Sequence, residues 1–169
     1  MCLNSKIITD LQLYFHKIFE VKSLRFYNKL LNRLLCNKKG KVVAYGKAYI
    51  VNPQNIVING EISINHGAYI NAYNPIYFGD DVTVSAGASI VSTGLDLEKF
   101  SNGEKSHIDN DGIHIGNHVW IGCNASIIGN VKITGEFVVI GAGAVVNKDI
   151  KESYTVWAGV PAKMIKRLF

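Results

Sequence analysis

The spacing of apolar residues changes near Gly40 and divides the chain into two parts. Before Gly40, aliphatic and aromatic residues recur every three or four positions, which is the spacing of one face of an α-helix. This pattern predicts an amphipathic helical segment over residues 7–36, within a first unit of residues 1–40. A weaker stretch near residues 20–23 allows a division into two helices. Residues 37–40 (NKKG) form a helix stop, because cations and then a glycine suit a helix C-terminus.

After Gly40, an apolar residue returns at every sixth position within each of several runs, and Gly, Asn, Asp, Ala and Ser fill the positions between. A six-residue repeat matches no helix. It predicts a triangular coil in which each side is a short strand that points one aliphatic side chain inward, while small residues form the corners. The repeating positions are Ile58, Ile64 and Ile70, then Phe78, Val84 and Ile90, then Ile115, Ile121, Ile127 and Ile133, then Ile140 and Val146.

This repeat predicts an all-β fold, a parallel β-helix over residues 41–150 that follows the N-terminal helical segment. Three hexads make a coil of about 18 residues, so the domain holds about five coils and Ile115 stacks on Ile133. Residues 92–112 contain no hexad and are polar and charged, which predicts a loop that projects from one corner and forms part of a binding face. Residues 151–169 form a C-terminal tail.

The net charge of +5 is unevenly distributed, because residues 1–40 carry +6 and the remaining residues carry −1. The near-neutral body argues against nucleic-acid binding, which needs basic residues along the recognising surface. The basic helical segment suits peripheral contact with the anionic inner membrane, and packing of its apolar stripe on the body or on a neighbouring subunit is an equal alternative. No signal peptide or membrane span is recognisable, and the three cysteines lack metal-site spacing, so we expect a cytoplasmic protein with reduced thiols.

Three motifs occur together in the second part of the chain: VWIG at residues 119–122, IGAGAVVNKDI at 140–150 and AGVPAKMIKR at 158–167. With the hexads, they resemble the hexapeptide-repeat acyltransferases, in particular the galactoside, maltose and polysaccharide O-acetyltransferases. The resemblance covers about two thirds of the chain, from Ile58 onward. It implies a left-handed coil, a homotrimer with active sites between subunits, and acetyl-CoA as the donor. It also implies a sugar hydroxyl as acceptor, expected in capsule, lipopolysaccharide or exopolysaccharide synthesis.

Acyl transfer to a hydroxyl needs a general base, because a neutral alcohol is a weak nucleophile near neutral pH, and a histidine suits this role. Galactoside and maltose acetyltransferases carry a histidine directly after a Thr-Gly pair, whereas here Leu95 follows that pair. Other members of the family, which this chain resembles more, start the loop with Gly-Leu-Asp or Gly-Leu-Glu and carry a later histidine. By that resemblance His107 is the predicted base.

Asp96, or with less support Asp109, is expected to orient the His107 ring from within the same loop. The other four histidines have weaker claims to the role of base. His118 is expected to line the cleft, and His66 to face an acceptor in the neighbouring subunit. His114 is expected to face outward on its strand, and His16 lies on the helical segment, where packing or surface exposure is expected.

The resemblance assigns further residues to substrate binding. Trp120 is expected beside the donor and acceptor. The small residues Gly141, Ala142, Gly143 and Ala144 let the pantetheine arm lie close to the backbone, although corners require the same small residues. The cations Lys163, Lys166 and Arg167 are expected to face the CoA phosphates. Cys123 has no adjacent base and is expected to fill a corner rather than to carry the acetyl group.

Other functions remain open on the pattern alone. N-acetylation of an amino group on a nucleotide-linked sugar is the main alternative, because the same histidine would serve it, and serine acetylation is a weaker one. The γ-type carbonic anhydrases share the coil and bind zinc through three histidines, but the spacing of His114 and His118 does not match theirs, and no metal is expected. A non-catalytic scaffold would not need the loop histidine, VWIG and the basic tail together.

Overall fold

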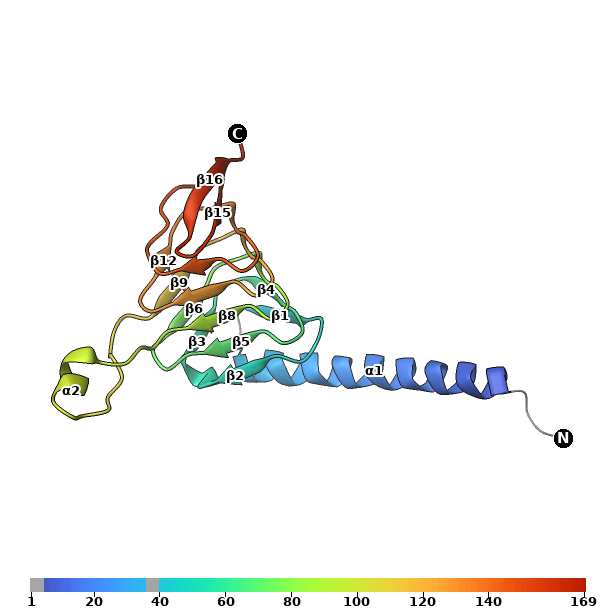
Figure 1. Ribbon diagram of the computed structural model, residues 1–169. Coiled ribbons are helices and arrows are strands. Elements are labelled where there is room, and N and C mark those ends of the chain that lie inside the picture. Colours follow the sequence, from blue (N-terminus) through green and yellow to red (C-terminus); the bar gives the residue numbers. More distant parts are fainter. Residues whose placement is uncertain (1–4, 36–39) are drawn as a thin grey trace.

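The chain folds as a left-handed, three-sided parallel β-helix, with the helix α1 lying across its first coil (Figure 1). The computed structural model describes residues 5–35 and 40–169, and side chains within α1 are described at position 14 and from position 20 onward. Helix α1 spans Ser5–Leu35 without interruption, so the suggested division into two helices near residues 20–23 is wrong. This stretch contains no Gly or Pro that would break it. Apart from Gly40, the predicted stop lies outside the described residues.

Each side of the β-helix is one sheet whose strands come from successive coils. Sheet A contains β1 (Lys41–Ala44), β4 (Glu61–Ile64), β7 (Val82–Val84), β10 (Val119–Ile121), β13 (Val138–Ile140), β15 (Thr155–Ala158) and β16 (Lys163–Arg167). Sheet B contains β2 (Tyr49–Val51), β5 (Tyr69–Asn71), β8 (Ser89–Val91), β11 (Ser126–Ile128) and β14 (Val145–Val146). Sheet C contains β3 (Ile56–Ile58), β6 (Ile76–Phe78), β9 (Ile113–Ile115) and β12 (Lys132–Ile133).

The chain visits sheets A, B and C in turn, and the edges where it passes between them are named corner A–B, corner B–C and corner C–A. Corner B–C holds the one-turn helix η1 (Pro53–Asn55) and the loop with helix α2 (Leu97–Ser101). Strand β15 pairs with β13 in parallel, so the coil continues into the C-terminal tail, and β16 then folds back antiparallel to β15.

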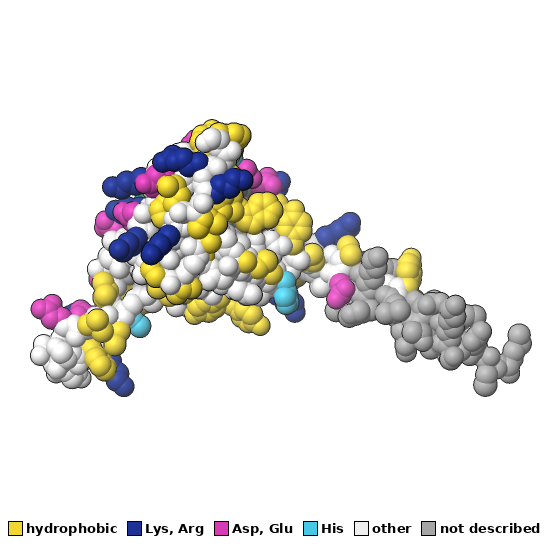
Figure 2. Space-filling view, turned by 45° about the horizontal axis from the view of Figure 1, so that its top comes forward, with side chains coloured by type: hydrophobic (Ala, Val, Ile, Leu, Met, Phe, Trp, Pro, Cys, Tyr) yellow, Lys and Arg dark blue, Asp and Glu magenta, His cyan; other side chains and the backbone are white. Residues whose placement is uncertain are grey.

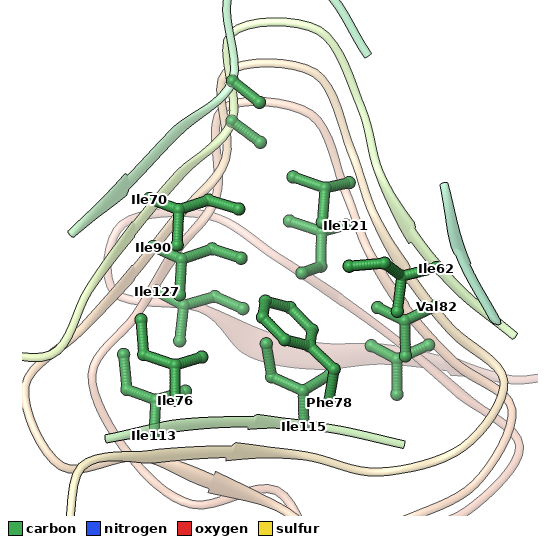
Figure 3. Close-up of a cluster of buried hydrophobic side chains, with 14 of the residues drawn as sticks. Ile62, Ile70, Ile76, Phe78, Val82, Ile90, Ile113, Ile115, Ile121 and Ile127 are labelled. Atoms are coloured by element: carbon green, nitrogen blue, oxygen red, sulfur yellow. The ribbon is translucent and has the colours of Figure 1, made fainter. Parts of the chain in front are cut away.

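The predicted hexad residues all lie in the interior of the prism. All twelve are at most 5% exposed, and they fall on sheets C, A and B in succession, which confirms the six-residue reading. Ile70, Ile90 and Ile127, for example, pair in register on sheet B and form one column (Figure 3). Each fully buried isoleucine stabilises the fold by about 1.5–3 kcal/mol relative to exposure.

The prediction of one inward side chain per side is wrong for most strands of sheets A and C. In β6 both Ile76 and Phe78 point inward, because side chains one residue apart in a strand alternate and the first and third share a face (Figure 3). Strands of sheet B supply one aliphatic residue each, and the interior beside them is filled by small residues of corner A–B: Ala68, Ala88, Ala125 and Ala144.

Coil length varies, and the 18-residue coil is a local feature. Ile115 does pair with Ile133, as predicted. The early coils are longer, because Ile56 pairs with Ile76, which is 20 residues away. The extra residues enter at the corners, so the strands keep their register while the corners change length.

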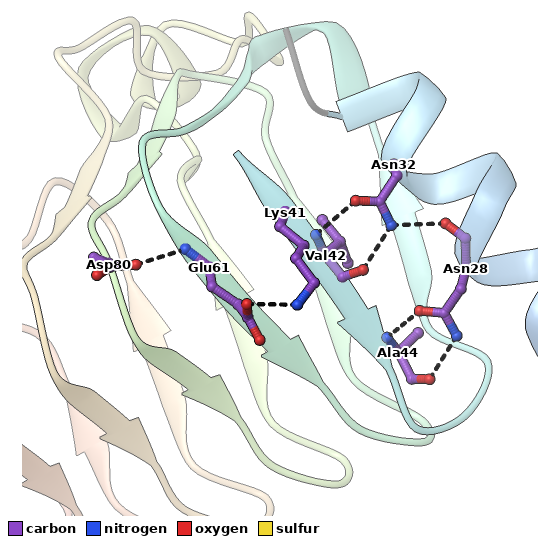
Figure 4. Close-up of polar contacts among 7 residues, drawn as sticks. All are labelled: Asn28, Asn32, Lys41, Val42, Ala44, Glu61 and Asp80. Atoms are coloured by element: carbon purple, nitrogen blue, oxygen red, sulfur yellow. Dashed lines mark hydrogen bonds and ion pairs between the residues drawn. The ribbon is translucent and has the colours of Figure 1, made fainter. Parts of the chain in front are cut away.

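Helix α1 closes the first coil. Its residues Leu31 and Leu35 are buried, and the Tyr27 hydroxyl group exchanges hydrogen bonds with the backbone of Ala48 at 3.0–3.1 Å. Two asparagine side chains of α1 also bond to the free edge of β1 (Figure 4). No helix in the described part of the chain has an apolar stretch long enough to cross a bilayer.

Candidate functional site

The predicted base lies on a loop that projects from corner B–C (Figure 1). The two ends of this loop form an antiparallel neck in which Leu95 faces His107, and the N–H group of Ile108 donates to the carbonyl of Gly94 at 3.0 Å. The imidazole of His107 is exposed and lies against the Tyr73 ring, with 4.8 Å between the ring centroids. His107 is therefore held by a defined backbone but open to a ligand.

The base of the neck is fixed by one buried side chain. Asn74 is 2% exposed, and its amide group donates to the carbonyls of Ser92 and Ile108 at 2.7 and 2.9 Å. This amide thus ties both ends of the loop to corner B–C. The sequence gives no hint of it, because an asparagine in a corner resembles every other turn asparagine.

Asp96, the residue predicted to orient the His107 ring, directly precedes α2. Its carboxylate caps the N-terminus of α2 and accepts from the backbone N–H groups of Glu98 and Lys99, both at 3.1 Å. No hydrogen bond within the described residues joins the His107 ring to Asp96 or to Asp109. An orienting role for either carboxylate stays a prediction.

A second group of predicted residues surrounds a hollow on the outer face of sheet A. Trp120 is 57% exposed there, and its indole N–H donates to the Ser85 hydroxyl at 3.1 Å. The hollow is lined by Asp81, Thr83, His118, Val119, Trp120, Phe137, Val139 and Leu168. Its lining is mostly apolar, with a carboxylate and an imidazole at one edge, which suits a ligand with an apolar body and a polar end.

At that edge, the Nδ1 atom of His118 lies 2.9 Å from the Oδ2 atom of Asp81. The His118 ring also stacks on Phe137, which stacks on Tyr154, with centroids 4.3 and 4.8 Å apart. These four residues all have positive φ, between 52° and 55°, because they occupy the same place of corner C–A in successive coils. The partnership of His118 with Asp81 was missed by sequence reasoning, since 37 residues separate them.

Corner A–B, at the other edge of sheet A, carries the small residues of the IGAGAVVNKDI motif, Gly141 to Ala144. Ala142 and Gly143 are exposed, and the N–H group of Ala142 donates to no acceptor in the described part of the chain. That N–H group is free to bond a ligand lying along the corner. His66 and Cys123 are exposed at the equivalent places of other coils, so both border the same edge.

The three predicted phosphate-binding cations do not share one face. In the β15–β16 pair, Lys163 is opposite Ala158 and Lys166 is opposite Val156, whereas Arg167 is opposite Thr155. Directly paired residues share a face. Lys163 and Lys166 therefore continue the outer face of sheet A above Trp120 and Val139, and Arg167 is on the other side.

The remaining histidines stand apart from this face. His114 is on the outer face of sheet C, where its ring stacks on Tyr77 with centroids 4.4 Å apart. The side chain of His16 lies outside the described residues. Among the described residues, no group of three His, Cys, Asp or Glu side chains is placed to hold a metal ion. His107, His114 and His118 are on different sides of the prism and do not converge.

Within one chain, the two halves of the predicted site lie on opposite sides. In a triangular prism, corner B–C is the edge opposite sheet A. His107 projects from that corner, whereas Trp120, His118 and Ala142 surround the outer face of sheet A. A single chain does not bring them together.

Comparisons with known proteins agree with this fold and these motifs. The chain is 34% identical over 122 residues to galactoside O-acetyltransferase of Escherichia coli K12, which covers 71% of this chain and 58% of that protein. It is 32% identical over 146 residues to the putative acetyltransferase YJL218W of Saccharomyces cerevisiae, covering 78% of this chain and 72% of that protein. The chain thus spans less than two thirds of the galactoside enzyme. No family model matches the chain.

A solved structure shows the same architecture. The hexapeptide-repeat-containing acetyltransferase VCA0836 of Vibrio cholerae O1 biovar eltor, in complex with acetyl-coenzyme A, superposes with a TM-score of 0.70. The match is 25% identical in sequence and covers 83% of this chain and 75% of that one. From the repeat, the coil and these relatives, the chain belongs to the hexapeptide-repeat acetyltransferases.

Proposed function

We propose that this protein transfers an acetyl group from acetyl-CoA to a hydroxyl group of a sugar, at sites formed between the subunits of a homotrimer. One observation carries the proposal. His107 and the hollow beside Trp120 lie on opposite sides of the prism, so a site that uses both needs a neighbouring chain. The galactoside relative supports the sugar hydroxyl as acceptor, and the neighbour bound to acetyl-coenzyme A supports the donor.

The outer face of sheet B suits the contact between subunits. Its outward side chains include no charged residue, which is the composition of an interface core: Tyr49, Val51, Tyr69, Asn71, Ser89, Val91, Ser126, Ile128 and Val145. This face lies between corner A–B and corner B–C. A neighbour docked on it would come close to the loop with His107 on one side and to Ala142 on the other.

The outer face of sheet A and corner A–B offer matching groups for the donor. We assign the free N–H group of Ala142 to an amide carbonyl of the pantetheine arm, and the hollow beside Trp120 to the region of the thioester. Lys163 and Lys166 lie further along the same face and suit the CoA phosphates. Arg167 is on the other side of β16 and is the weakest member of the predicted trio.

In the proposed reaction, the neutral imidazole of His107 removes the proton of the acceptor hydroxyl as its oxygen attacks the thioester carbon. The tetrahedral intermediate collapses with cleavage of the C–S bond, and the imidazolium returns the proton to the departing thiolate. The products are the O-acetyl sugar and free CoA. The His107 side chain is exposed, so an acceptor can reach it, and its backbone is fixed by the loop neck, which positions the ring.

We place the acceptor among sugars of surface polysaccharides and the reaction in the cytoplasm. The support is the resemblance of the loop, which starts with Gly94, Leu95 and Asp96, to transferases of that class. An amino sugar linked to a nucleotide would need the same base, so it is included in the test.

The direct test is release of free CoA thiol from acetyl-CoA across a panel of sugars, oligosaccharides and nucleotide-linked amino sugars. His107→Ala is expected to lower turnover by about 10²-fold or more, with the oligomeric mass unchanged. His114→Ala is the matched control, because that histidine stacks on Tyr77 on the outer face of sheet C, away from both halves of the proposed site. Near-normal turnover of the His107 variant would rule out this residue as the base.

The shared site is tested by mixing subunits. If His107→Ala and Trp120→Glu are each inactive, trimers co-assembled from equal amounts of both are expected to regain about one quarter of the wild-type sites. Each restored site takes its histidine from one chain and its tryptophan from another. Mixed trimers that stay inactive would show that both halves come from the same chain.

A further inference from the structure

The described end of helix α1 has three faces, and the β-helix covers only one of them. Tyr27, Asn28, Leu31 and Leu35 contact the first coil through buried surface or hydrogen bonds. At about 100° per residue, the residues between them point away from the prism. The other two faces therefore need a separate explanation.

The second face is apolar and exposed. Phe26, Leu30 and Leu34 follow one another at four-residue spacing and are 71%, 42% and 55% exposed. Leu30 and Leu34 also border an apolar groove of about 190 Å³ that continues onto Ile50 and Pro53 of the first coil. An exposed stripe of this kind is costly in water and indicates a contact surface.

The third face is basic. Lys22, Arg25, Lys29 and Arg33 are exposed, and none of them forms an ion pair within the described residues. By helix geometry they occupy a sector of about 80° directly beside the apolar stripe. Figure 2 shows basic and apolar side chains close together on the described part of α1 where it leaves the prism.

We propose that α1 is a docking surface for an anionic lipid bilayer, with the apolar stripe inserted at the headgroup boundary and the basic stripe against the lipid phosphates. An apolar stripe flanked by Lys and Arg is the pattern of helices that lie in a membrane interface. Each Lys or Arg near an anionic surface strengthens such binding electrostatically. This proposal does not depend on the proposed reaction.

The position of α1 gives this contact a defined orientation. The helix runs across the first coil and extends beyond it, and the loop with α2 projects to another side (Figure 1). A protein held through α1 would stand with its first coil at the bilayer and its C-terminal strands away from it. In a trimer, which rests on the proposed function, three such helices would bind together and increase the avidity.

A second copy of the chain is the other candidate for this surface, and the charge disfavours it. A two-fold contact would bring the same residues of two helices together. The four cations would then face four cations across the interface. A bilayer of anionic lipid instead complements them.

The test is co-sedimentation of the full chain with vesicles of phosphatidylcholine alone and with 30% phosphatidylglycerol. We expect binding to the anionic vesicles only, weakened by added salt. Lys29→Glu with Arg33→Glu is expected to lower the partition coefficient by at least about tenfold. Phe26→Ser with Leu30→Ser is expected to lower it to a similar extent, because both side chains are exposed and supply apolar surface for insertion.

The matched control is Lys148→Glu with Lys151→Glu, which makes the same charge change on exposed residues of the last coil. It should bind anionic vesicles almost as the wild type does. Equal binding of all variants, or none by the wild type, would overturn the proposal. The proposal would also be overturned if Phe26→Ser with Leu30→Ser lowered the oligomeric mass without changing lipid binding. That result would show that a second copy of the chain covers this surface. Acetyl transfer to a soluble sugar, measured in parallel, reports on the proposed reaction separately.

Discussion

The side chain of Asn32 forms two hydrogen bonds with the backbone of Val42, accepting from its N–H group at 2.9 Å and donating to its carbonyl at 2.6 Å (Figure 4). Asn28, one helical turn earlier, makes the same pair of bonds with Ala44, at 2.6 and 2.8 Å. The two amides thus replace a neighbouring strand along the free edge of β1. An exposed edge of this kind otherwise invites pairing with another chain.

Replacing both asparagines with alanine should release α1 and expose this edge. The four hydrogen bonds between these side chains and β1 are lost, and backbone groups of β1 lose their partners, so each substitution should cost about 1–3 kcal/mol of unfolding free energy. Hydrogen exchange should show faster exchange at the amides of Val42 and Ala44. Lys29→Ala, an exposed change on the same helix, is the control. Unchanged protection at both amides would contradict this account.

The core should tolerate loss of a hexad side chain poorly. Ile121 is fully buried between Val84 and Ile140 of the adjacent coils, so Ile121→Ala should lower the unfolding free energy by about 2–5 kcal/mol. Val57→Ala on the outer face of sheet C is the matched control, because that side chain is 40% exposed and lies outside the proposed subunit contact. Denaturant unfolding of the two variants at the same protein concentration compares their unfolding free energies. A similar cost for both would mean that the interior is not the main source of stability.

The sequence predicts the interior well because one strong constraint, an inward apolar residue, is repeated at every side of every coil. The twelve predicted positions from Ile58 to Val146 are all buried. Coil length was less predictable, since corners absorb insertions without disturbing strand register, as between Ile56 and Ile76. The second inward residue in strands of sheets A and C, such as Ile76, was not predicted, because its spacing of two from Phe78 does not appear in the six-residue repeat.

The polar parts were predicted less completely, because their partners are far apart in the chain. Asn74 and Asn32 look like ordinary turn and helix residues until the coil places Ile108 and Val42 beside them. The Asp81 partner of His118 is visible only once β7 and β10 are known to be neighbours. The roles of His107 and the other predicted site residues remain predictions that activity must test.

Gly112 should be the most sensitive glycine of the loop. It has a φ of 79°, and an added Cβ atom would lie 1.8 Å from the carbonyl oxygen of Pro75. Gly112→Ala should therefore cost at least about 2 kcal/mol and displace the end of the loop that carries His107. Gly103→Ala is the matched control, because Gly103 has a φ of 84° but open space around it. Thermal unfolding and acetyl transfer should both separate the two variants, and equal effects would mean that backbone angle, rather than the contact with Pro75, sets the cost.

The hydrogen bond between the His118 ring and the Asp81 carboxylate should matter little for stability. The side chains are 36% and 72% exposed, and pairs of this kind contribute about 0–1 kcal/mol. Asp81→Asn and His118→Asn suit the test, since asparagine tolerates the positive φ at both positions. We expect both variants to keep their fold and His118→Asn to lower turnover by less than about tenfold. A loss as large as that expected for His107→Ala would instead identify His118 as the base.

Thr93, at the base of the loop neck, has a buried hydroxyl group without a hydrogen-bond partner among the described residues. An unpaired buried hydroxyl costs about 1–3 kcal/mol, so Thr93→Val, which keeps the shape, should leave the melting temperature unchanged or raise it. Ser92→Ala is the contrasting variant, because the Ser92 hydroxyl donates to the carbonyl of Asn74 at 2.6 Å and its loss should destabilise the neck. If Thr93→Val raises stability but lowers acetyl transfer, the hydroxyl is kept for the substrate or for the neighbouring subunit. A fall in the melting temperature would show instead that the hydroxyl has a partner within the folded chain.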